Sequence, residues 1–308
     1  MTGIKIEDIA YVRFRAPDLD LMETFLGEFG LVRAARSADT LYMRGAGTSP
    51  FVHVTHLGEA GFVGLGFAGE SLADLERLAG EEGIAPVVSD APGGGRLLQL
   101  ADPDSFRIDV VAGQTPVAPL PLPQRVPTND ASARPRTEAV KRVGSGPAHV
   151  LRIGHAVLNV TDFRRSEAWY KSRLGFLTSD EIVLDGMPDS LGAFLRCDRG
   201  TAPTDHHTLF LVGAGAPKFN HAAFEVADFD DLMTGHDHLK AKGRTHAWGV
   251  GRHILGSQIF DYWRDPWGHA VEHWTDGDRI SAAFGSHKAS LEALVGTQWG
   301  PGAPPSMA

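Results

Sequence analysis

The sequence predicts an α+β protein built of two tandem modules, and three features of the chain indicate this. Within residues 4–112 the strand-like and helix-like segments follow the order β-α-β-β twice, with room for a further short strand in each half. The same order returns after residue 148, and a proline-rich stretch separates the two regions. We therefore expect an N-terminal module over residues 1–115, a linker over 116–147, a C-terminal module over 148–285 and a tail over 286–308.

The first module contains a strand over residues 9–15, a helix over 19–29, a second helix around 71–82 and a closing hairpin over 97–111. Asp18 opens the first helix and Gly30 closes it, as short polar residues and glycine commonly do. The linker is marked by its prolines, which favour extended backbone and do not continue helices: Pro116, Pro119, Pro121, Pro123, Pro127 and Pro135.

The second module repeats the first, and the repeat can be read at four places. The matching pairs are Asp18-Leu19 with Asp162-Phe163, Phe29-Gly30-Leu31 with Leu174-Gly175-Phe176, Ser71–Leu75 with Asp228–Leu232, and Asp102-Pro103 with Asp265-Pro266. An internal repeat of this length indicates duplication of one structural unit.

A β-hairpin is expected over residues 251–274, around the turn Asp265-Pro266-Trp267-Gly268. Proline at the second position and glycine at the fourth are typical of a type I turn. If Gly268 forms the bulge of a three-residue loop, the register places Tyr262 directly opposite Glu272 on one face of the sheet.

Two other strand-like segments each carry a histidine, His155 in IGHAV and His221 in FNHAAF. Two imidazoles and one carboxylate from separate strands, here with Glu272, form the facial triad of a mononuclear metal site with open positions. A single histidine in a strand is more often a core or surface residue, and the chain has 14 histidines.

The repeat tests this triad within one chain. At the equivalent positions of the first module stand Tyr11, Gly64 and Asp109, so both imidazoles are missing there. We therefore expect a metal in the C-terminal module only.

Composition excludes several classes of function. The formal charge of −9 argues against nucleic acid or an anionic membrane as partner, and no apolar run reaches the length of a membrane span. The single cysteine, Cys197, excludes an internal disulfide and indicates a cytoplasmic protein.

The chain resembles the vicinal oxygen chelate superfamily, and its tandem modules are similar to those of the type I extradiol catechol dioxygenases. Beyond the triad, the resemblance rests on the Asp205-His206-His207-Thr208 stretch, on Gly251-Arg252-His253 and on Tyr262. One departure is Ile254-Leu255-Gly256, where many relatives carry a polar Asn-Asp pair after the histidine.

The resemblance implies paired βαβββ units forming a curved, barrel-like sheet in each module. It implies Fe(II), with Mn(II) as the alternative ion, held by His155, His221 and Glu272. A small aromatic diol and O2 would be the substrates, with a ring-opened semialdehyde-type product, in aromatic compound degradation. A homo-oligomer is the implied assembly.

The resemblance also assigns roles to individual residues. His207 would be the acid–base catalyst, while Tyr262 and His253 would contact the substrate. Strand alternation allows one of the two adjacent histidines to face the metal, which would put Leu209 and Leu211 on the face of His207. Phe194 is a candidate substrate-binding residue, and Leu191 and Met187 could line the pocket beside it, although a core role is the favoured interpretation for all three. The C-terminal tail could fold over the mouth of the pocket.

Two other classes of function stay open. A glyoxalase-like isomerase or a thiol transferase would use the same ligands around a redox-inert or Mn(II) ion, without needing His207, His253 and Tyr262 together. A metal-free binding protein of the bleomycin-resistance kind would not need the triad.

Overall fold

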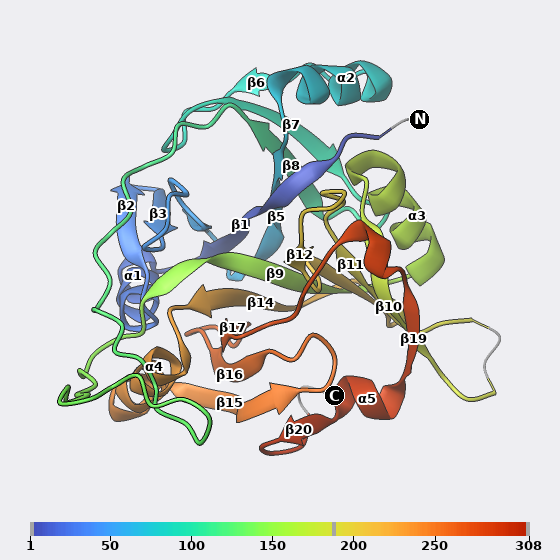
Figure 1. The fold of residues 1–308 in the computed structure, drawn as a ribbon. Helices are drawn as coiled ribbons and strands as arrows, with labels where there is room; N and C mark the ends of the chain where they lie inside the picture. Colours follow the sequence, from blue (N-terminus) through green and yellow to red (C-terminus); the bar gives the residue numbers. More distant parts are fainter. Residues whose placement is uncertain (1–2, 187–188, 306–308) are drawn as a thin grey trace.

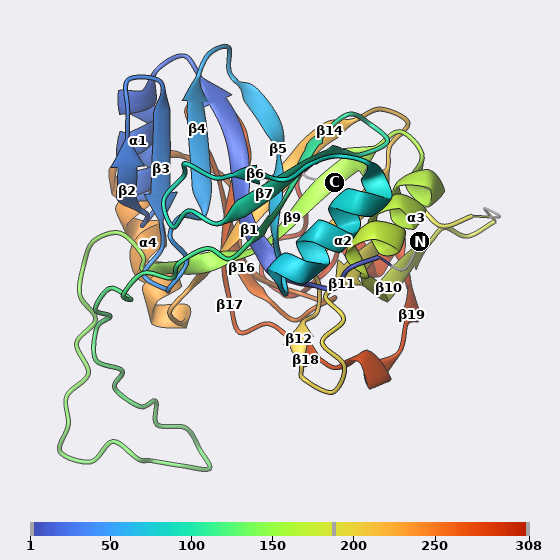
Figure 2. The ribbon, with the colours of Figure 1, turned by 90° about the horizontal axis from the view of Figure 1, so that it is seen from above.

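The computed structural model describes residues 3–186 and 189–305, which form an α+β fold with two large β-sheets (Figure 1). Each sheet curls into an open half-barrel, as comparison of Figures 1 and 2 shows. The predicted fold class is confirmed.

The N-terminal sheet has eight strands, and its units follow the order βαβββ twice. The first unit consists of β1 (Ile6–Ala16), α1 (Leu19–Glu28), β2 (Val32–Arg36), β3 (Thr40–Arg44) and β4 (His53–Leu57). The second consists of β5 (Gly61–Gly69), α2 (Leu72–Glu82), β6 (Val87–Val88), β7 (Arg96–Ala101) and β8 (Arg107–Ala112). The spatial order is β2-β3-β4-β1-β5-β8-β7-β6. The carboxylate of Asp18 accepts a hydrogen bond from the Leu21 N–H and caps α1, as the sequence predicts.

The second sheet repeats this arrangement with ten strands. Its first unit is β9 (Val150–Val160), α3 (Phe163–Leu174), β10 (Leu177–Val183), β11 (Gly192–Arg196) and β13 (Leu209–Gly213). Its second unit is β14 (Lys218–Val226), α4 (Phe229–Ala241), β15 (Thr245–His253), β16 (Ile259–Arg264) and β17 (Ala270–Thr275). Two short strands, β12 (Thr204–Asp205) and β18 (Arg279–Ile280), pair beside it.

The register of the two sheets confirms the repeat at the level of single residues. In the second sheet Ala223 of β14 pairs with both His155 of β9 and Glu272 of β17. In the first sheet Gly66 of β5 pairs with both Tyr11 and Asp109.

Tyr11 and Asp109 therefore stand where the second module has His155 and Glu272, and Gly64 stands where it has His221. In this first module the carboxylate of Asp109, which is fully buried, accepts hydrogen bonds from the Tyr11 hydroxyl at 2.9 Å and from the Arg13 guanidinium at 2.8 Å. A side-chain cation thus neutralises the carboxylate at the position equivalent to the triad.

One hydrophobic core runs through both modules. The ring of Phe14 in β1 packs edge-on against Phe219 in β14, with 5.1 Å between ring centroids. His273 in β17 stacks on Phe29 at the end of α1, and its Nε2–H donates to the Phe29 carbonyl at 2.7 Å. Helix α3 lies beside α2 (Figure 2), and the Tyr170 hydroxyl of α3 donates to Asp102 of the first module at 2.9 Å.

The proline-rich linker is fixed at its start and then leaves the body of the protein. The backbone N–H groups of Val117 and Leu120 donate to carbonyls of Thr48 and Ala46. The following residues form the wide loop that extends away from both sheets in Figure 2.

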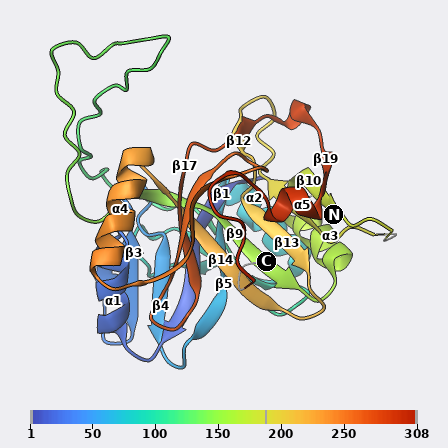
Figure 3. The same ribbon diagram turned by 90° about the horizontal axis from the view of Figure 1, so that it is seen from below.

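The C-terminal tail adds to the second sheet. Strand β19 (His287–Ser290) pairs with β10, and β20 (Thr297–Trp299) pairs with β15. Between them the short helix α5 (Leu291–Val295) lies across the open side of the half-barrel (Figure 3). Among the described residues, no helix is long and apolar enough to cross a membrane.

Replacing Arg13 by Leu should lower the free energy of unfolding by about 3–5 kcal/mol, because the buried Asp109 carboxylate loses its cation. Urea titration followed by circular dichroism measures this. Arg107 also contacts Asp109, but its side chain is 31% exposed, so Arg107→Leu should cost less. Equal costs for the two variants would contradict the role assigned to Arg13.

Candidate metal centre and active site

Three strands bring His155, His221 and Glu272 together in the second half-barrel. Nε2 of His155 lies 3.3 Å and Nε2 of His221 lies 3.4 Å from the same carboxylate oxygen of Glu272. All three side chains are buried, and their ligand atoms converge on one point. The arrangement follows from the topology, because β14 lies between β9 and β17.

The Glu272 carboxylate indicates that this site is built for a cation. The side chain is 0% exposed, and neither oxygen has a hydrogen-bond partner among the described residues. Burial would raise the pKa of Glu272, but the adjacent imidazoles of His155 and His221 hold that pKa well below its usual range. A buried, ionised carboxylate without hydrogen bonds is strongly unfavourable unless a positive charge lies beside it. The two-His, one-carboxylate set fits Fe(II), with positions left for further ligands.

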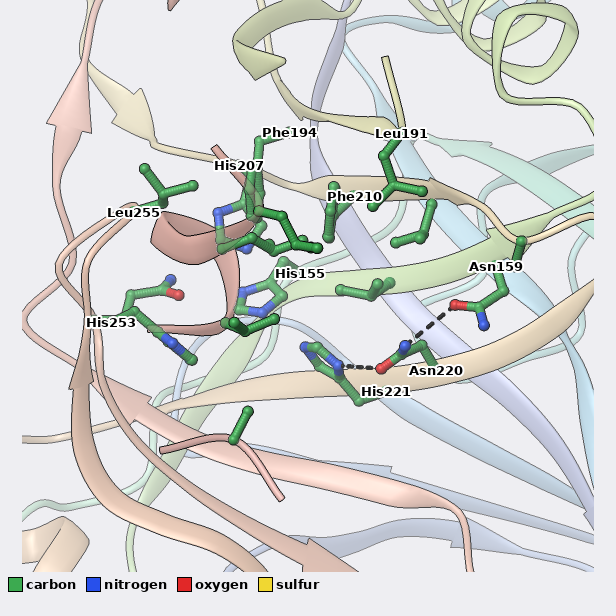
Figure 4. A pocket seen from close by; sticks show the side chains of 18 of the residues that line it. His155, Asn159, Leu191, Phe194, His207, Phe210, Asn220, His221, His253 and Leu255 are labelled. Atoms are coloured by element: carbon green, nitrogen blue, oxygen red, sulfur yellow. Dashed lines mark hydrogen bonds between the residues drawn. The ribbon is translucent and has the colours of Figure 1, made fainter. Parts of the chain in front are cut away.

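The orientation of His221 is fixed by a β-bulge in β14. The pairing with β9 shifts between Phe219 and His221, so Asn220 is the extra residue. The Asn220 side-chain oxygen lies 2.9 Å from Nδ1 of His221, and its amide donates to Asn159 at 3.1 Å (Figure 4). Because an amide oxygen only accepts, Nδ1 carries the proton and Nε2 is left with its lone pair for a metal.

His207 lies on the wall of the cavity above the triad, with its ring centroid 4.1 Å from that of His155. Burial, and next the proximity of His155, lower its pKa well below the usual value, so the ring is neutral near pH 7. His206 does not line the cavity and instead places Nε2 2.6 Å from Asp180.

The two adjacent histidines contact each other through their Nδ1 atoms, which lie 3.1 Å apart. A carboxylate only accepts, so Nε2 of His206 donates to Asp180. Nε2 of His207 takes part in neither contact and can serve as the base when it is unprotonated.

The prediction that Leu209 and Leu211 lie on the same face as His207 is wrong. Leu209 and Leu211 belong to the hydrophobic core, whereas Phe210 and Val212 line the cavity. The reason is that His206 and His207 precede β13 in irregular backbone, so strand alternation does not extend back to them.

Tyr262 and His253 lie together on the other side of the triad. The predicted register is confirmed, since Tyr262 pairs with Glu272 across the β16–β17 hairpin and Gly268 has φ 89°. The Tyr262 hydroxyl is 3.1 Å from Nε2 of His253, and its ring stacks on Trp248. Burial, and then the charge of Glu272, raise the pKa of Tyr262 well above its usual value, so the phenol keeps its proton.

The triad opens into a cavity of about 360 Å³ (Figure 4). Phe194 lies in its wall, stacked on Phe210 with 4.0 Å between ring centroids. Tail residues close the mouth. Apolar and aromatic side chains form most of the wall: Val157, Leu191, Phe194, Phe210, Val212, Trp248, Leu255, Leu291, Leu294, Val295 and Ala303. Met187, which could also line the pocket, lies outside the described residues.

The sequence analysis did not identify several residues of this site. Asn220 adjoins a predicted ligand, but an unbroken strand would turn it away from the cavity, and only the bulge brings it in. Asp180 is 26 residues from His206 and carries no motif. The tail residues Leu291, Leu294 and Val295 do have helical spacing, which is a usable signal.

Replacing Asn220 by Leu should weaken Fe(II) binding about 10- to 100-fold, because the tautomer and ring plane of His221 are then no longer fixed. Competition with a coloured ferrous chelator measures the dissociation constant. Asn159→Leu is the matched control. It should have a smaller effect, because Asn159 is hydrogen-bonded to Asn220 and not to His221 itself. An unchanged iron affinity in Asn220→Leu would exclude the positioning role.

Comparison with known proteins agrees with this geometry. Residues 152–273 match the family model described as "Glyoxalase/Bleomycin resistance protein/Dioxygenase superfamily". The chain is 29% identical over 324 residues to Metapyrocatechase 2 of Cupriavidus necator, covering 97% of this chain and 90% of that protein. It is 29% identical over 133 residues to an iron-dependent extradiol dioxygenase of Rhodococcus jostii, covering 42% of this chain and 44% of that protein.

Solved structures share the fold. The Mn(II)-bound glyoxalase from Novosphingobium aromaticivorans superposes with a TM-score of 0.79 at 24% identity, over 99% of this chain and 94% of that chain. An extradiol ring-cleaving dioxygenase from B. fuscum gives 0.79 at 18% identity, over 100% of this chain and 83% of that chain. Residues 152–273 therefore match this superfamily, and nearly the whole chain is similar in sequence to a metapyrocatechase and in fold to an extradiol ring-cleaving dioxygenase.

Proposed function

We propose that this protein is an Fe(II)-dependent extradiol dioxygenase that opens the ring of a catechol-type aromatic next to its vicinal diol, with O2 as co-substrate. The observation that carries this proposal is the buried His155, His221 and Glu272 triad, which faces a mostly apolar cavity with His207 and Tyr262 on its wall. Fe(II) bound there supplies a centre that both catechol oxygens can chelate and that can pass electrons to O2.

The residues around the triad have separate proposed roles. His207 takes a proton from the substrate diol at Nε2 and returns it later in the reaction, which needs a group that is neutral near pH 7. Tyr262 keeps its proton and donates a hydrogen bond to a substrate oxygen. Nε2 of His253 lies 3.1 Å from the Tyr262 hydroxyl. His253 orients this hydroxyl and also contacts the substrate. The tail over the cavity excludes water.

The substrate that suits this cavity is a single ring with uncharged substituents. Phe194 and Phe210 offer a stacking surface, and Leu255 adds a further apolar side chain to the wall. No lysine or arginine is among the described residues that line the cavity. A substituent carboxylate would therefore be buried without a cationic partner, at a cost of several kcal/mol.

We further propose that residues 148–285 form the catalytic module, while the N-terminal module, residues 1–115, holds no metal because Arg13 already neutralises Asp109. We also propose a homo-oligomer in the cytoplasm. The edge strand β6, with Val88 81% exposed, supports an interface between copies, and Cys197 is a free thiol, as a reducing compartment requires. A monomeric mass in light scattering would contradict the oligomer.

Oxygen uptake by the iron-loaded, reduced protein tests the function. We expect one O2 consumed per ring opened, a yellow semialdehyde-type product, and higher rates with methyl- or chlorocatechols than with dihydroxybenzoates or dihydroxynaphthalene. No oxygen consumption with any of these diols would contradict the proposal. Activity of the zinc-loaded protein on a glutathione adduct would instead favour a glyoxalase-like isomerase.

His207→Phe tests the acid–base role in the same assay. Turnover should fall by about 10²- to 10⁴-fold, the usual contribution of a positioned proton-transfer group. Iron content and catechol binding should be largely unchanged, because His207 is not one of the three ligands. Unchanged turnover would assign the proton transfer to another group.

A further inference from the structure

A second cluster of two histidines and one carboxylate lies on the outer face of the same sheet. His236 comes from α4, His246 from β15 and Asp261 from β16. Figure 1 shows α4 beside the start of β15. Because Asp261 is adjacent to Tyr262 in a strand, its side chain points away from the active-site cavity, whose lining includes none of these three residues.

The geometry of this cluster is close to that of the iron triad. Nε2 of His246 lies 2.8 Å from one oxygen of Asp261, and Nδ1 of His236 lies 3.2 Å from the same oxygen. The corresponding distances in the triad are 3.3 Å and 3.4 Å. Tetrahedral zinc, with bonds of about 2.0–2.2 Å, places its ligand atoms about 3.4 Å apart. Moving His246 away from Asp261 by about 0.6 Å and His236 by about 0.2 Å would therefore admit the ion.

The carboxylate is fixed in the way that metal ligands usually are. Asp261 is 0% exposed, and the indole N–H of Trp263 donates to its second oxygen at 2.6 Å. That contact leaves the first oxygen directed between the two imidazoles. Burial would raise the pKa of Asp261, but the neighbouring imidazoles, His236 first, hold it below its usual value, so the group is ionised.

The two imidazoles can change from hydrogen-bond donors to metal ligands by moving or releasing one proton each. In the structure one nitrogen of each ring is within hydrogen-bond distance of Asp261. Because an ionised carboxylate can only accept, each of these nitrogens must carry a proton. A neutral imidazole can carry its proton on the other nitrogen instead, and His246 is exposed to solvent. Two lone pairs and one carboxylate oxygen would then face one point, and a cation there would take the place of the two protons.

We propose that His236, His246 and Asp261 form a second metal site, for zinc or a similar divalent transition-metal ion, that fastens α4 to the outer face of β15 and β16. Two imidazoles and a carboxylate suit zinc, and such sites bind it more tightly than Fe(II). The fourth position faces solvent beside His246 and is filled by water. Its role is structural, because the site does not open into the substrate cavity.

Isothermal titration of the iron-loaded, full-length protein with zinc chloride tests this proposal. We expect one zinc bound per chain in addition to the iron, with the iron content unchanged, and a higher thermal midpoint of unfolding. His236→Gln and His246→Gln should each weaken zinc binding at least about tenfold, since each removes one of three protein ligands. Both variants should retain their iron.

His238→Gln is the matched control, because His238 lies on the same helix but is not part of the cluster. It should bind zinc as the unmodified protein does. The proposal is overturned if zinc binds only by displacing iron, if no further zinc binds, or if His236→Gln and His246→Gln bind zinc no more weakly than His238→Gln. The three side chains would then form only a hydrogen-bonded clamp.

Discussion

The structure of the second module depends on one fully buried carboxylate. Glu272 has no hydrogen-bond partner among the described residues, and two imidazoles meet one of its oxygens. A cation at the point where His155 and His221 converge would balance this buried charge. Burial, and then the charge of this carboxylate, raise the pKa of Tyr262 and keep it protonated, so the metal centre and the hydrogen-bond donor beside it both depend on Glu272.

Each module has a buried carboxylate at the equivalent position, and the charge of that carboxylate is balanced differently in the two modules. Asp109 occupies the position of Glu272 in the first module, and there a guanidinium and a phenol from the same strand satisfy it. Gly64, at the position of His221, brings no side chain to that point. The first module is thus closed by its own residues, whereas the second requires an ion and keeps a cavity beside it.

Much of the site follows from short-range rules of sequence. The turn at Asp265 and Gly268 defines the hairpin register, so Tyr262 could be placed opposite Glu272. The internal repeat places both histidines, because a duplicated fold gives each position a counterpart whose identity can be compared.

The features of the site that the sequence did not predict depend on departures from regular secondary structure or on contacts between residues far apart in the chain. A β-bulge turns Asn220 into the cavity, and irregular backbone before β13 breaks the alternation that would have placed Leu209 beside His207. Asp180 meets His206 only because of tertiary folding. The tail adds edge strands whose few residues have no periodicity to detect. All of these features involve contacts between different helices, strands or loops, whereas a sequence pattern describes one helix or strand at a time.

The central claim is that the triad directs both atoms of O2 into an aromatic ring beside its diol. The most direct measurement is mass spectrometry of the product formed under oxygen-18 gas in ordinary water. Rapid reduction of the aldehyde would prevent exchange of its oxygen with solvent. We predict that the ring-opened product carries two heavy oxygen atoms, one in the carboxylate and one in the alcohol formed by reduction of the aldehyde. A product without heavy oxygen in its carboxylate would contradict the account.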